Sequence, residues 1–418
     1  MIDNTLSMMD CRRAIEALRS GVPNRYAVRA MGCDQVQVAQ LFGQKLEQAR
    51  AHLSAGRHVS GILVSGDFGS GKSHLLEYLE DRALSEEFVC SRVVISKETP
   101  LYDAAKLYRA AIESAQIPGH PAWTMADLTS RLHDTDEYAR FHRWCSSADS
   151  AVSGLFAATL FLHERLHNDP ERVESVVNFW FGERLPVTKI REGLKLLDAT
   201  SLFRLQAVPA KQLALERFLF TARMVAGAGY RGWLLLFDEL ELVAQYSLLQ
   251  RAKSYAELAR WMGLLDREHY PGLLAIGTIT DDFDPMVLQA KGDFGGLRGK
   301  LEAKGHRAIA EMAEAGMTLI RNGAVTLEAP NQRALDDIYQ RLKELHARAY
   351  AWTPPEIARA QASMMTRMRT HVRRWINEWD LVRLYPTVHV SIEERQLLPN
   401  YEENVELEKP PDASNEEL

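Results

Sequence analysis

The sequence has little cysteine and no long apolar run, and both shortages exclude whole classes of protein. Its four cysteines, at positions 11, 33, 90 and 145, form no CxxC pair and no Cys/His pair. They predict reduced, unpaired thiols, and neither a disulfide framework nor a zinc site. No stretch approaches the ~20 apolar residues that a membrane-spanning helix needs. The first residues are acidic and polar and lack the apolar segment of a signal peptide. We therefore expect a cytoplasmic protein with no membrane partner.

Neither sign of charge dominates most of the chain. The 418 residues carry a formal charge of −6. Residues 392–418 hold nine acidic and two basic side chains, a charge of −7, which leaves the first 391 residues near +1. The net charge therefore neither favours nor excludes a nucleic-acid partner. The acidic composition of 392–418 predicts a disordered tail.

The spacing of apolar residues predicts an α/β protein with a parallel sheet. Short apolar runs indicate strands, and helical periodicity fills the stretches between most of them. The predicted strands lie within 58–66, 88–96, 232–239, 272–280 and 324–330. Strands that alternate with helices predict βαβ units and a sheet covered on both faces.

The same patterns divide the chain into six segments. We predict an N-terminal helical lead, a core in two parts separated by a helical insert, a C-terminal helical lid and the acidic tail. The helical lead is 1–57, and the two parts of the core are 58–119 and 208–330. The insert is 120–207, the lid is 331–391 and the tail is 392–418. A hairpin at 386–392 would make the lid winged-helix-like. The glycine-rich, charged stretch 281–306 is predicted to be an exposed loop.

The clearest motif is GDFGSGKS, residues 66–73, which matches the phosphate-loop pattern G-x-x-x-x-G-K-[ST] at every fixed position. It follows an apolar strand and precedes a helix, as the motif requires. Glycines let successive backbone N–H groups point at phosphate oxygens, and the helix N-terminus adds positive potential. We expect Lys72 to reach the β- and γ-phosphates and the Ser73 hydroxyl to ligate Mg²⁺. The predicted ATP-binding residues are Gly66, Asp67, Phe68, Gly69, Ser70, Gly71, Lys72, Ser73 and His74.

LLLFDELELV, residues 234–243, is a strongly apolar strand that runs into carboxylates. We expect this strand to lie next to the strand of the phosphate loop, with Asp238 holding the hydration shell of Mg²⁺. Glu239 is then the general base that polarises the attacking water. The alternative is that Glu239 begins a helix and pairs with its free N–H groups. We expect Glu241 to be a solvated or loop-pairing acid.

The next strand ends in Thr278, where a sensor of the γ-phosphate or of water would lie. A hydroxyl that simply caps the strand is the other interpretation, and Thr280 is the alternative residue.

Arginines could complete the site, because ATPases of this architecture commonly use one from a neighbouring subunit or domain. Arg298 is our candidate for this trans role, with Arg307 and Arg321 as rivals. A second arginine could reach over the nucleotide from the helix predicted at about 354–380. We choose Arg369 there over Arg367, Arg373 and Arg374, and a solvated basic helix face is the alternative.

Two further patterns are weighed against ordinary structure. His163, Glu164 and His167 match the zinc-protease pattern H-E-x-x-H, but Asp169-Pro170 break the helical pattern directly afterwards, and only Glu183 lies in range as a third ligand. A surface helix in the insert is the preferred interpretation.

Trp375 and Trp379 lie four residues apart beside basic residues, and we expect them to form the core of the lid rather than a base-stacking platform.

Together these pieces resemble the ATP-binding proteins of bacteriophage-exclusion (BREX) defence islands, of the BrxD type. SGDFGSGKSHLLEYL (65–79) and GYRGWLLLFDELE (229–241) carry the resemblance, which extends over most of 8–385. It implies an AAA+-like core of the branch that includes origin-binding ATPases and STAND-type switches. It also implies nucleotide binding by 66–73, metal binding by Asp238 and catalysis by Glu239.

Two functions of different classes follow. The first is a Mg²⁺-dependent ATPase that serves as motor or switch on or near double-stranded DNA. Its expected partners are other phage-defence proteins and, with ATP bound, further copies of itself. The second is a nucleotide-gated scaffold with little turnover, and Glu239 separates the two because only turnover requires a base. A small-molecule kinase fits less well, since such enzymes are usually shorter and need neither this lid nor the insert.

Overall fold

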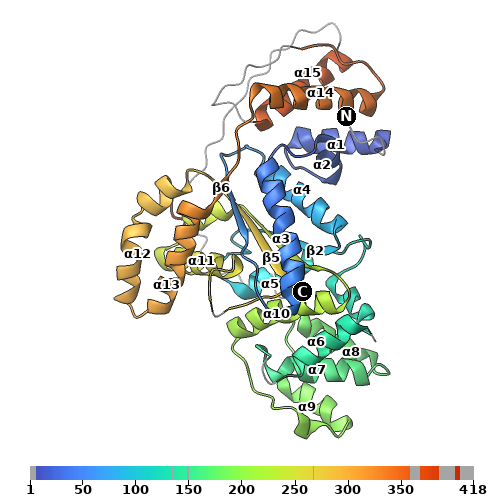
Figure 1. The fold of residues 1–418 in the computed structure, drawn as a ribbon, viewed down its shortest axis with the longest axis vertical. Coiled ribbons are helices and arrows are strands. Elements are labelled where there is room, and N and C mark those ends of the chain that lie inside the picture. The colour runs from blue at the N-terminus through green and yellow to red at the C-terminus, as the bar shows by residue number, and fades with distance from the viewer. Residues whose placement is uncertain are drawn as a thin grey trace, which may run out of the picture.

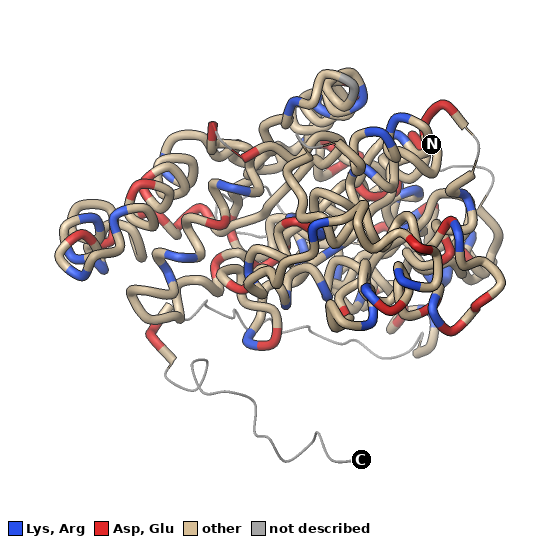
Figure 2. Tube along the Cα trace, turned by 90° about the horizontal axis from the view of Figure 1, so that it is seen from below, with Lys and Arg blue, Asp and Glu red and all other residues tan. Residues whose placement is uncertain are grey.

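The computed structural model describes residues 6–133, 135–147, 150–266, 268–357, 368–385 and 401–404. Figure 1 shows a central sheet with helices on both sides, a cluster of helices below it and a separate layer of helices above it. Lys and Arg are interspersed with Asp and Glu along the described chain (Figure 2). None of its helices is both long and apolar enough to span a bilayer.

The sheet has six strands in the order β3-β2-β4-β5-β1-β6, and every neighbouring pair is parallel except β2 with β3. The strands are β1 (Ile62–Ser65), β2 (Phe88–Val94), β3 (Ala115–Gln116), β4 (Gly232–Asp238), β5 (Leu273–Ile279) and β6 (Val325–Thr326). Each run predicted as a strand contains one. The two-residue β3 was not predicted, because so short a segment has no detectable period.

The strand order corrects one expectation. The acid strand β4 does not lie next to the phosphate-loop strand β1, because β5 pairs with both of them. Ile276 of β5 is in register with Ile62 on one side and with Leu236 on the other. Consequently Thr278, near the end of β5, contacts Asp238 directly from this neighbouring strand.

The sheet is buried on both faces, and neighbouring residues of each strand belong to different cores. Leu234 packs with α3 (Val36–Ser54) and α4 (Lys72–Ser85) on one face. Leu235 faces the other core, which contains α5 (Ala104–Glu113), α10 (Ala210–Gly227), α11 (Leu248–Trp261) and α13 (Arg307–Thr318). The alternation follows from the two-residue period of a strand and explains why the run LLLF is apolar throughout.

Residues 120–207 are mostly helical. They form η1 (Met125–Arg131), α6 (Asp136–Cys145), α7 (Gly154–Arg165), α8 (Pro170–Trp180), α9 (Val187–Leu196) and η2 (Thr200–Leu202). Phe141, Phe156 and Trp180 join this region to the main core by packing around Phe220 of α10.

The H-E-x-x-H pattern is used structurally. Because α7 ends at Arg165, His163 and His167 do not share a helical face. Glu164 accepts a hydrogen bond from Tyr138 and lies 3.5 Å from His142. Within the described ranges, no group of three or more His, Cys, Asp or Glu side chains is arranged to hold a metal ion.

The stretch 281–306 is mostly exposed, as predicted, but the prediction that it is a loop is wrong. This stretch contains the π-helix η4 (Asp284–Gln289) and α12 (Asp293–Glu302). Arg251 of α11 fixes the start of α12 by pairing with the buried Asp293 at 2.7 Å, where the helix dipole favours a carboxylate. Three glycines in α12 lower its intrinsic helix propensity, so tertiary contacts outweigh the local signal.

The N-terminal and C-terminal helices pack together in a layer of their own. It consists of α1 (Met8–Ser20), α2 (Arg25–Met31), α14 (Gln332–Tyr350) and α15 (Met368–Leu384). Trp375 and Trp379 are 1% and 0% exposed at its centre, which confirms their prediction as core. The predicted hairpin at 386–392 and most of the acidic tail lie outside the described residues.

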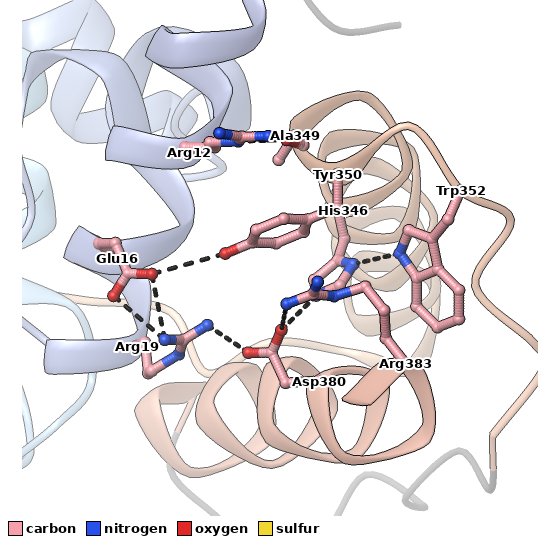
Figure 3. Close-up of polar contacts among 9 residues, drawn as sticks. All are labelled: Arg12, Glu16, Arg19, His346, Ala349, Tyr350, Trp352, Asp380 and Arg383. Atoms are coloured by element: carbon pink, nitrogen blue, oxygen red, sulfur yellow. Dashed lines mark hydrogen bonds and ion pairs between the residues drawn. The ribbon is translucent and has the colours of Figure 1, made fainter. Parts of the chain in front are cut away.

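Polar contacts hold α1 against α14 and α15 (Figure 3). Arg19 of α1 pairs with Asp380 of α15, and Asp380 also lies 3.3 Å from His346 of α14. Burial opposes ionisation of Asp380, but the His346 hydrogen bond and the Arg19 charge outweigh it and lower the pKa of that carboxyl. The first and last described helices are therefore one unit.

Candidate functional site

The phosphate loop turns sharply between β1 and α4. Gly69 and Gly71 have φ angles of +81° and +105°, a region in which other residues are strained. A side chain at Gly66 would place its Cβ 2.7 Å from the Ser70 hydroxyl. The backbone conformation thus requires glycine at 69 and 71, and the side chains packed against residue 66 favour glycine there.

Lys72 is 8% exposed and bonds to the loop that precedes it. Its Nζ donates to the carbonyl of Gly66 at 2.8 Å and to that of Asp67 at 3.2 Å. An ammonium group has three hydrogens, so one remains for a phosphate oxygen. Lys72 is therefore held at the mouth of the loop in advance of any ligand.

Asp238 lies at the exit of β4 and is 5% exposed. Its Oδ1 accepts hydrogen bonds from the Thr278 hydroxyl at 2.8 Å and from the Glu239 backbone N–H at 3.1 Å. Its Oδ2 accepts from Arg92 of β2 at 2.7 Å, and Arg92 also lies 3.2 Å from Glu77 of α4. Thr278, rather than Thr280, is the threonine that contacts the predicted metal carboxylate.

Glu239 follows Asp238 in a left-handed backbone conformation, φ +61° and ψ +35°, which is uncommon outside glycine. This turn redirects the chain from β4 into η3 (Leu240–Gln245). Burial and the charge of Asp238 raise the pKa of Glu239, against the attraction of Lys72, Arg369 and Arg92. A raised pKa makes the carboxylate a stronger proton acceptor at neutral pH.

Glu241 was expected to be a solvated or loop-pairing acid, and it is not solvated. It is 7% exposed, and its Oε2 finds no hydrogen-bond partner within the described chain. Burial raises the pKa of Glu241 to about 7, and the charge of Lys72 opposes that rise. The η3 turn folds this side chain inward, a consequence of three-dimensional packing that the local sequence does not reveal.

A cavity of about 240 Å³ opens beside the phosphate loop, between the sheet and the layer of N- and C-terminal helices. Gly69 and Ser73 line it from the loop, Cys33 from the segment after α2, and Ile338 and Arg369 from α14 and α15. A mostly apolar pocket next to a phosphate-binding loop suits a nucleoside. Within the described chain, the Ser70 hydroxyl is buried there without a partner.

His74 links α4 to another wall of this cavity. Its Nε2 lies 2.9 Å from the carbonyl of Gly32, and because a carbonyl only accepts, Nε2 carries the hydrogen. Burial lowers the pKa of His74, so the neutral ring is favoured. The structure therefore gives His74 a positioning contact with the 32–35 segment.

The candidate trans arginines lie on another part of the molecule. Arg298 of α12 pairs with Glu302 at 3.0 Å and Glu314 at 2.6 Å. Arg307 pairs with Glu311 at 3.0 Å, and the exposed Arg321 stacks over Phe294 at 4.5 Å. In Figure 1, α12 and α13 lie at the left edge, away from α4 and α15. None of the three contacts the phosphate loop of its own chain, and their trans role stays a prediction.

Arg369 is the arginine of α15 that approaches the loop. Its backbone N–H donates to the carbonyl of Gly69 at 3.4 Å, and its guanidinium lies 5.7 Å from the centre of the Phe68 ring. Arg373 caps α1 through the carbonyls of Arg19 and Ser20. Arg374 pairs with Glu378, and Arg367 lies outside the described residues.

The oxygen donors near the loop suit Mg²⁺. This ion binds proteins through one or two oxygen ligands and completes its shell with phosphate oxygens and water. Ser73 and Asp238 are the predicted protein ligands, and no hydrogen bond of the Ser73 hydroxyl is found in the described part of the chain. They would hold the ion between the loop and β4.

Sequence reasoning missed Arg92 and the segment 32–35. Arg92 is the one charged residue of the strand FVCSRVV, and this isolated charge was a signal that could have been followed. The residue types of 32–35 do not predict a pocket wall, because the position of this segment depends on the packing of α2 against α4.

Comparison with known proteins adds a family to this geometry. A search of curated proteins finds no match. A family model described as BREX system ATP-binding protein BrxC/D matches residues 7–129 and 211–382, and the unmatched stretch between them holds α6 to α9. The match covers well over half of the chain and includes the phosphate loop, the acid strand and the helices around the cavity. It supports an ATP-binding role in phage defence. The chain belongs to the family of BREX system ATP-binding proteins BrxC/D.

Proposed function

We propose that this protein binds Mg²⁺-ATP between the phosphate loop and the N- and C-terminal helices and hydrolyses it in a phage-defence system. The observation that carries the proposal is the meeting of Lys72, Asp238, Thr278 and Glu239 at one edge of the sheet, next to a cavity of nucleoside size. The core is AAA+-like in this proposal, and α14 and α15 serve as its lid.

Binding divides between the two halves of the nucleotide. The backbone amides of 66–73 and the free hydrogen of Lys72 take the phosphates, while the cavity takes the base and ribose. Arg369 lies between these halves, against Phe68, where its charge would stabilise the phosphates. Closing α15 onto the loop would exclude water from the reaction.

Hydrolysis needs a base, an oriented water and compensation of the charge that develops. Glu239 accepts the proton of the attacking water, and its raised pKa favours this role. Thr278 orients Asp238 through the bond at 2.8 Å. Bound Mg²⁺ supplies neutralisation of the phosphate oxygens, and Ser73 and Asp238 would hold it.

A scaffold with little turnover is the second candidate function. The Arg92–Asp238 pair favours it, because the predicted metal carboxylate is already neutralised by a cation of its own chain. If the ion pair is the ground state, nucleotide binding would separate Arg92 from Asp238 and thereby change the conformation of the protein.

Three partner classes belong to the same proposal: other phage-defence proteins, further copies of this chain and double-stranded DNA. The mixed charges in Figure 2 predict modest, salt-sensitive contact with DNA rather than tight binding. Binding that persists unchanged above physiological salt would contradict direct phosphate contact.

The decisive experiment measures ATP turnover of the purified protein with Mg²⁺, with EDTA and in the Lys72→Ala variant. We expect phosphate release that depends on Mg²⁺ and disappears both with EDTA and in Lys72→Ala. Turnover is also measured with and without double-stranded DNA, and the mass of the protein is measured in each nucleotide state. ATP binding in a Lys72-dependent manner without turnover would favour the scaffold. Retained ATP binding in Lys72→Ala would overturn the site itself.

A further inference from the structure

Residues 401–404 lie at the carboxyl edge of the sheet, against the loops that follow β4 and β5. The Tyr401 hydroxyl donates to Asp282 Oδ1 at 2.5 Å, and because its single hydrogen is used there, it accepts from the Thr280 hydroxyl at 2.8 Å. The Asn404 backbone N–H donates to the carbonyl of Gln245 at 2.9 Å. This 401–404 segment therefore links the two loops that leave the strands of Asp238 and Thr278.

An ion pair adds a third contact. Glu403 lies 2.6 Å from Arg251, whose side chain is 3% exposed. Arg251 also bonds to Asp293 and, at 2.7 Å, to the carbonyl of Tyr246. The buried arginine is thus satisfied without Glu403, which is itself 55% exposed. The 401–404 segment can therefore leave the core without leaving the buried charge of Arg251 unpaired.

The 401–404 segment docks on the catalytic edge and not on a remote surface. Tyr401 packs on the main core and lies close enough to Glu241 for the two to interact electrostatically. Glu241, in turn, interacts with Lys72 and Glu239. The segment therefore lies beside the group of charged side chains that includes Lys72 and Glu239.

The contact is suited to reversible docking. It uses four residues, and the fifteen residues 386–400 connect it to Tyr385, which directly follows α15. Fifteen residues span at most about 50 Å, and attachment to the same chain raises the local concentration of the segment at this edge far above that of a separate molecule. A weak contact is then well populated within one chain, yet a partner that binds the same edge can displace it.

We propose that residues 401–404 form an intramolecular brake on the ATPase site, and this inference rests on the proposed hydrolytic function. In the docked state the segment holds the loops after β4 and β5 together and covers the catalytic edge. Turnover requires its release, which a neighbouring subunit or another defence protein brings about by competing for that edge.

The test uses three variants of the full chain. Tyr401→Phe removes the hydroxyl and keeps the ring, Glu403→Gln removes the ion pair, and Tyr385→Phe removes the hydroxyl of a tyrosine that is 57% exposed. We expect turnover at saturating ATP to rise about fivefold in the first two, the effect of one lost hydrogen bond on a docking equilibrium. The KM for ATP should stay within about twofold, and Tyr385→Phe should match the unaltered protein.

Hydrogen exchange at the Asn404 amide provides a readout without nucleotide. It should accelerate in Tyr401→Phe and Glu403→Gln and not in Tyr385→Phe. Faster exchange with unchanged or lower turnover would overturn the brake, because undocking would then not activate the site. If the unaltered protein hydrolyses ATP and the variants never exceed it, only the brake fails. If no form hydrolyses bound ATP, the proposed hydrolysis fails and the brake with it.

Discussion

Arg92 of β2 donates a hydrogen bond to Oδ2 of Asp238 over 2.7 Å, so the carboxylate predicted to hold Mg²⁺ is already paired with a cation. The side chains are 21% and 7% exposed, and the pair is therefore only partly screened by water. Arg92 has a second partner in Glu77 at 3.2 Å. It can therefore release Asp238 without losing all compensation for its charge.

A double-mutant cycle measures this pair. Arg92→Gln should lower the free energy of unfolding by about 1–3 kcal/mol, because Asp238 and Glu77 lose a charged partner. The loss should be smaller by about 1 kcal/mol or more when the substitution is made in an Asp238→Asn protein. Urea unfolding of the four proteins without nucleotide gives the coupling. Additive losses would show that the bond contributes nothing to stability.

Glu239→Gln separates binding from chemistry. The amide keeps the shape of the side chain but cannot accept the proton of the attacking water, so turnover should fall by about 10²–10⁴. Affinity for Mg²⁺-ATP should stay within about threefold, since the predicted binding contacts come from the loop and Asp238. Phosphate release and titration of a fluorescent nucleotide measure the two quantities. Glu311→Gln, an exposed glutamate of α13, is the control, and turnover close to that of the unaltered protein in Glu239→Gln would remove the base from the proposal.

Local motifs predicted the parts of this site that are contiguous in sequence. GDFGSGKS and the acids after LLLF can be recognised from the local sequence alone. A phosphate-binding turn needs glycines, and carboxylates directly after a buried apolar strand are unusual without a functional reason. Arg92, His74 and Tyr401 act through partners that are 42 to 146 residues away along the chain. Their roles depend on strand order and helix packing, which pattern and spacing do not specify. For the same reason the sequence did not predict that β5 lies between β1 and β4 in the sheet.

Glu80 of α4 should make stability depend on pH. It is 3% exposed and accepts a hydrogen bond from Gln116 at 2.8 Å. Burial, with a further contribution from Glu77, raises its pKa from 4.5 to about 7. The folded protein therefore binds a proton that the unfolded chain releases above pH 4.5. The stabilisation is full below that pH and is lost as the pH rises through 7.

Glu80→Gln isolates this contribution, because glutamine keeps the acceptor for Gln116 and does not titrate. The stability of the unaltered protein relative to Glu80→Gln should decrease by on the order of 2–3 kcal/mol between pH 5 and pH 8. Urea unfolding at a series of pH values measures the difference. Parallel pH profiles for the two proteins would show that Glu80 is ionised in the folded state throughout.

Filling the cavity should weaken nucleotide binding without touching the phosphate loop. Ala334 of α14 lines the cavity, whereas its neighbour Arg333 is exposed and does not. Ala334→Trp places an indole where the base is proposed to lie, so affinity for ATP should fall at least tenfold. Binding of inorganic triphosphate, which needs only the loop, should change less than threefold. Calorimetric titration of both ligands measures this, and Arg333→Trp is the matched control. An equal loss for ATP and triphosphate would mean that the substitution disturbs the loop, and no loss for either would place the base elsewhere.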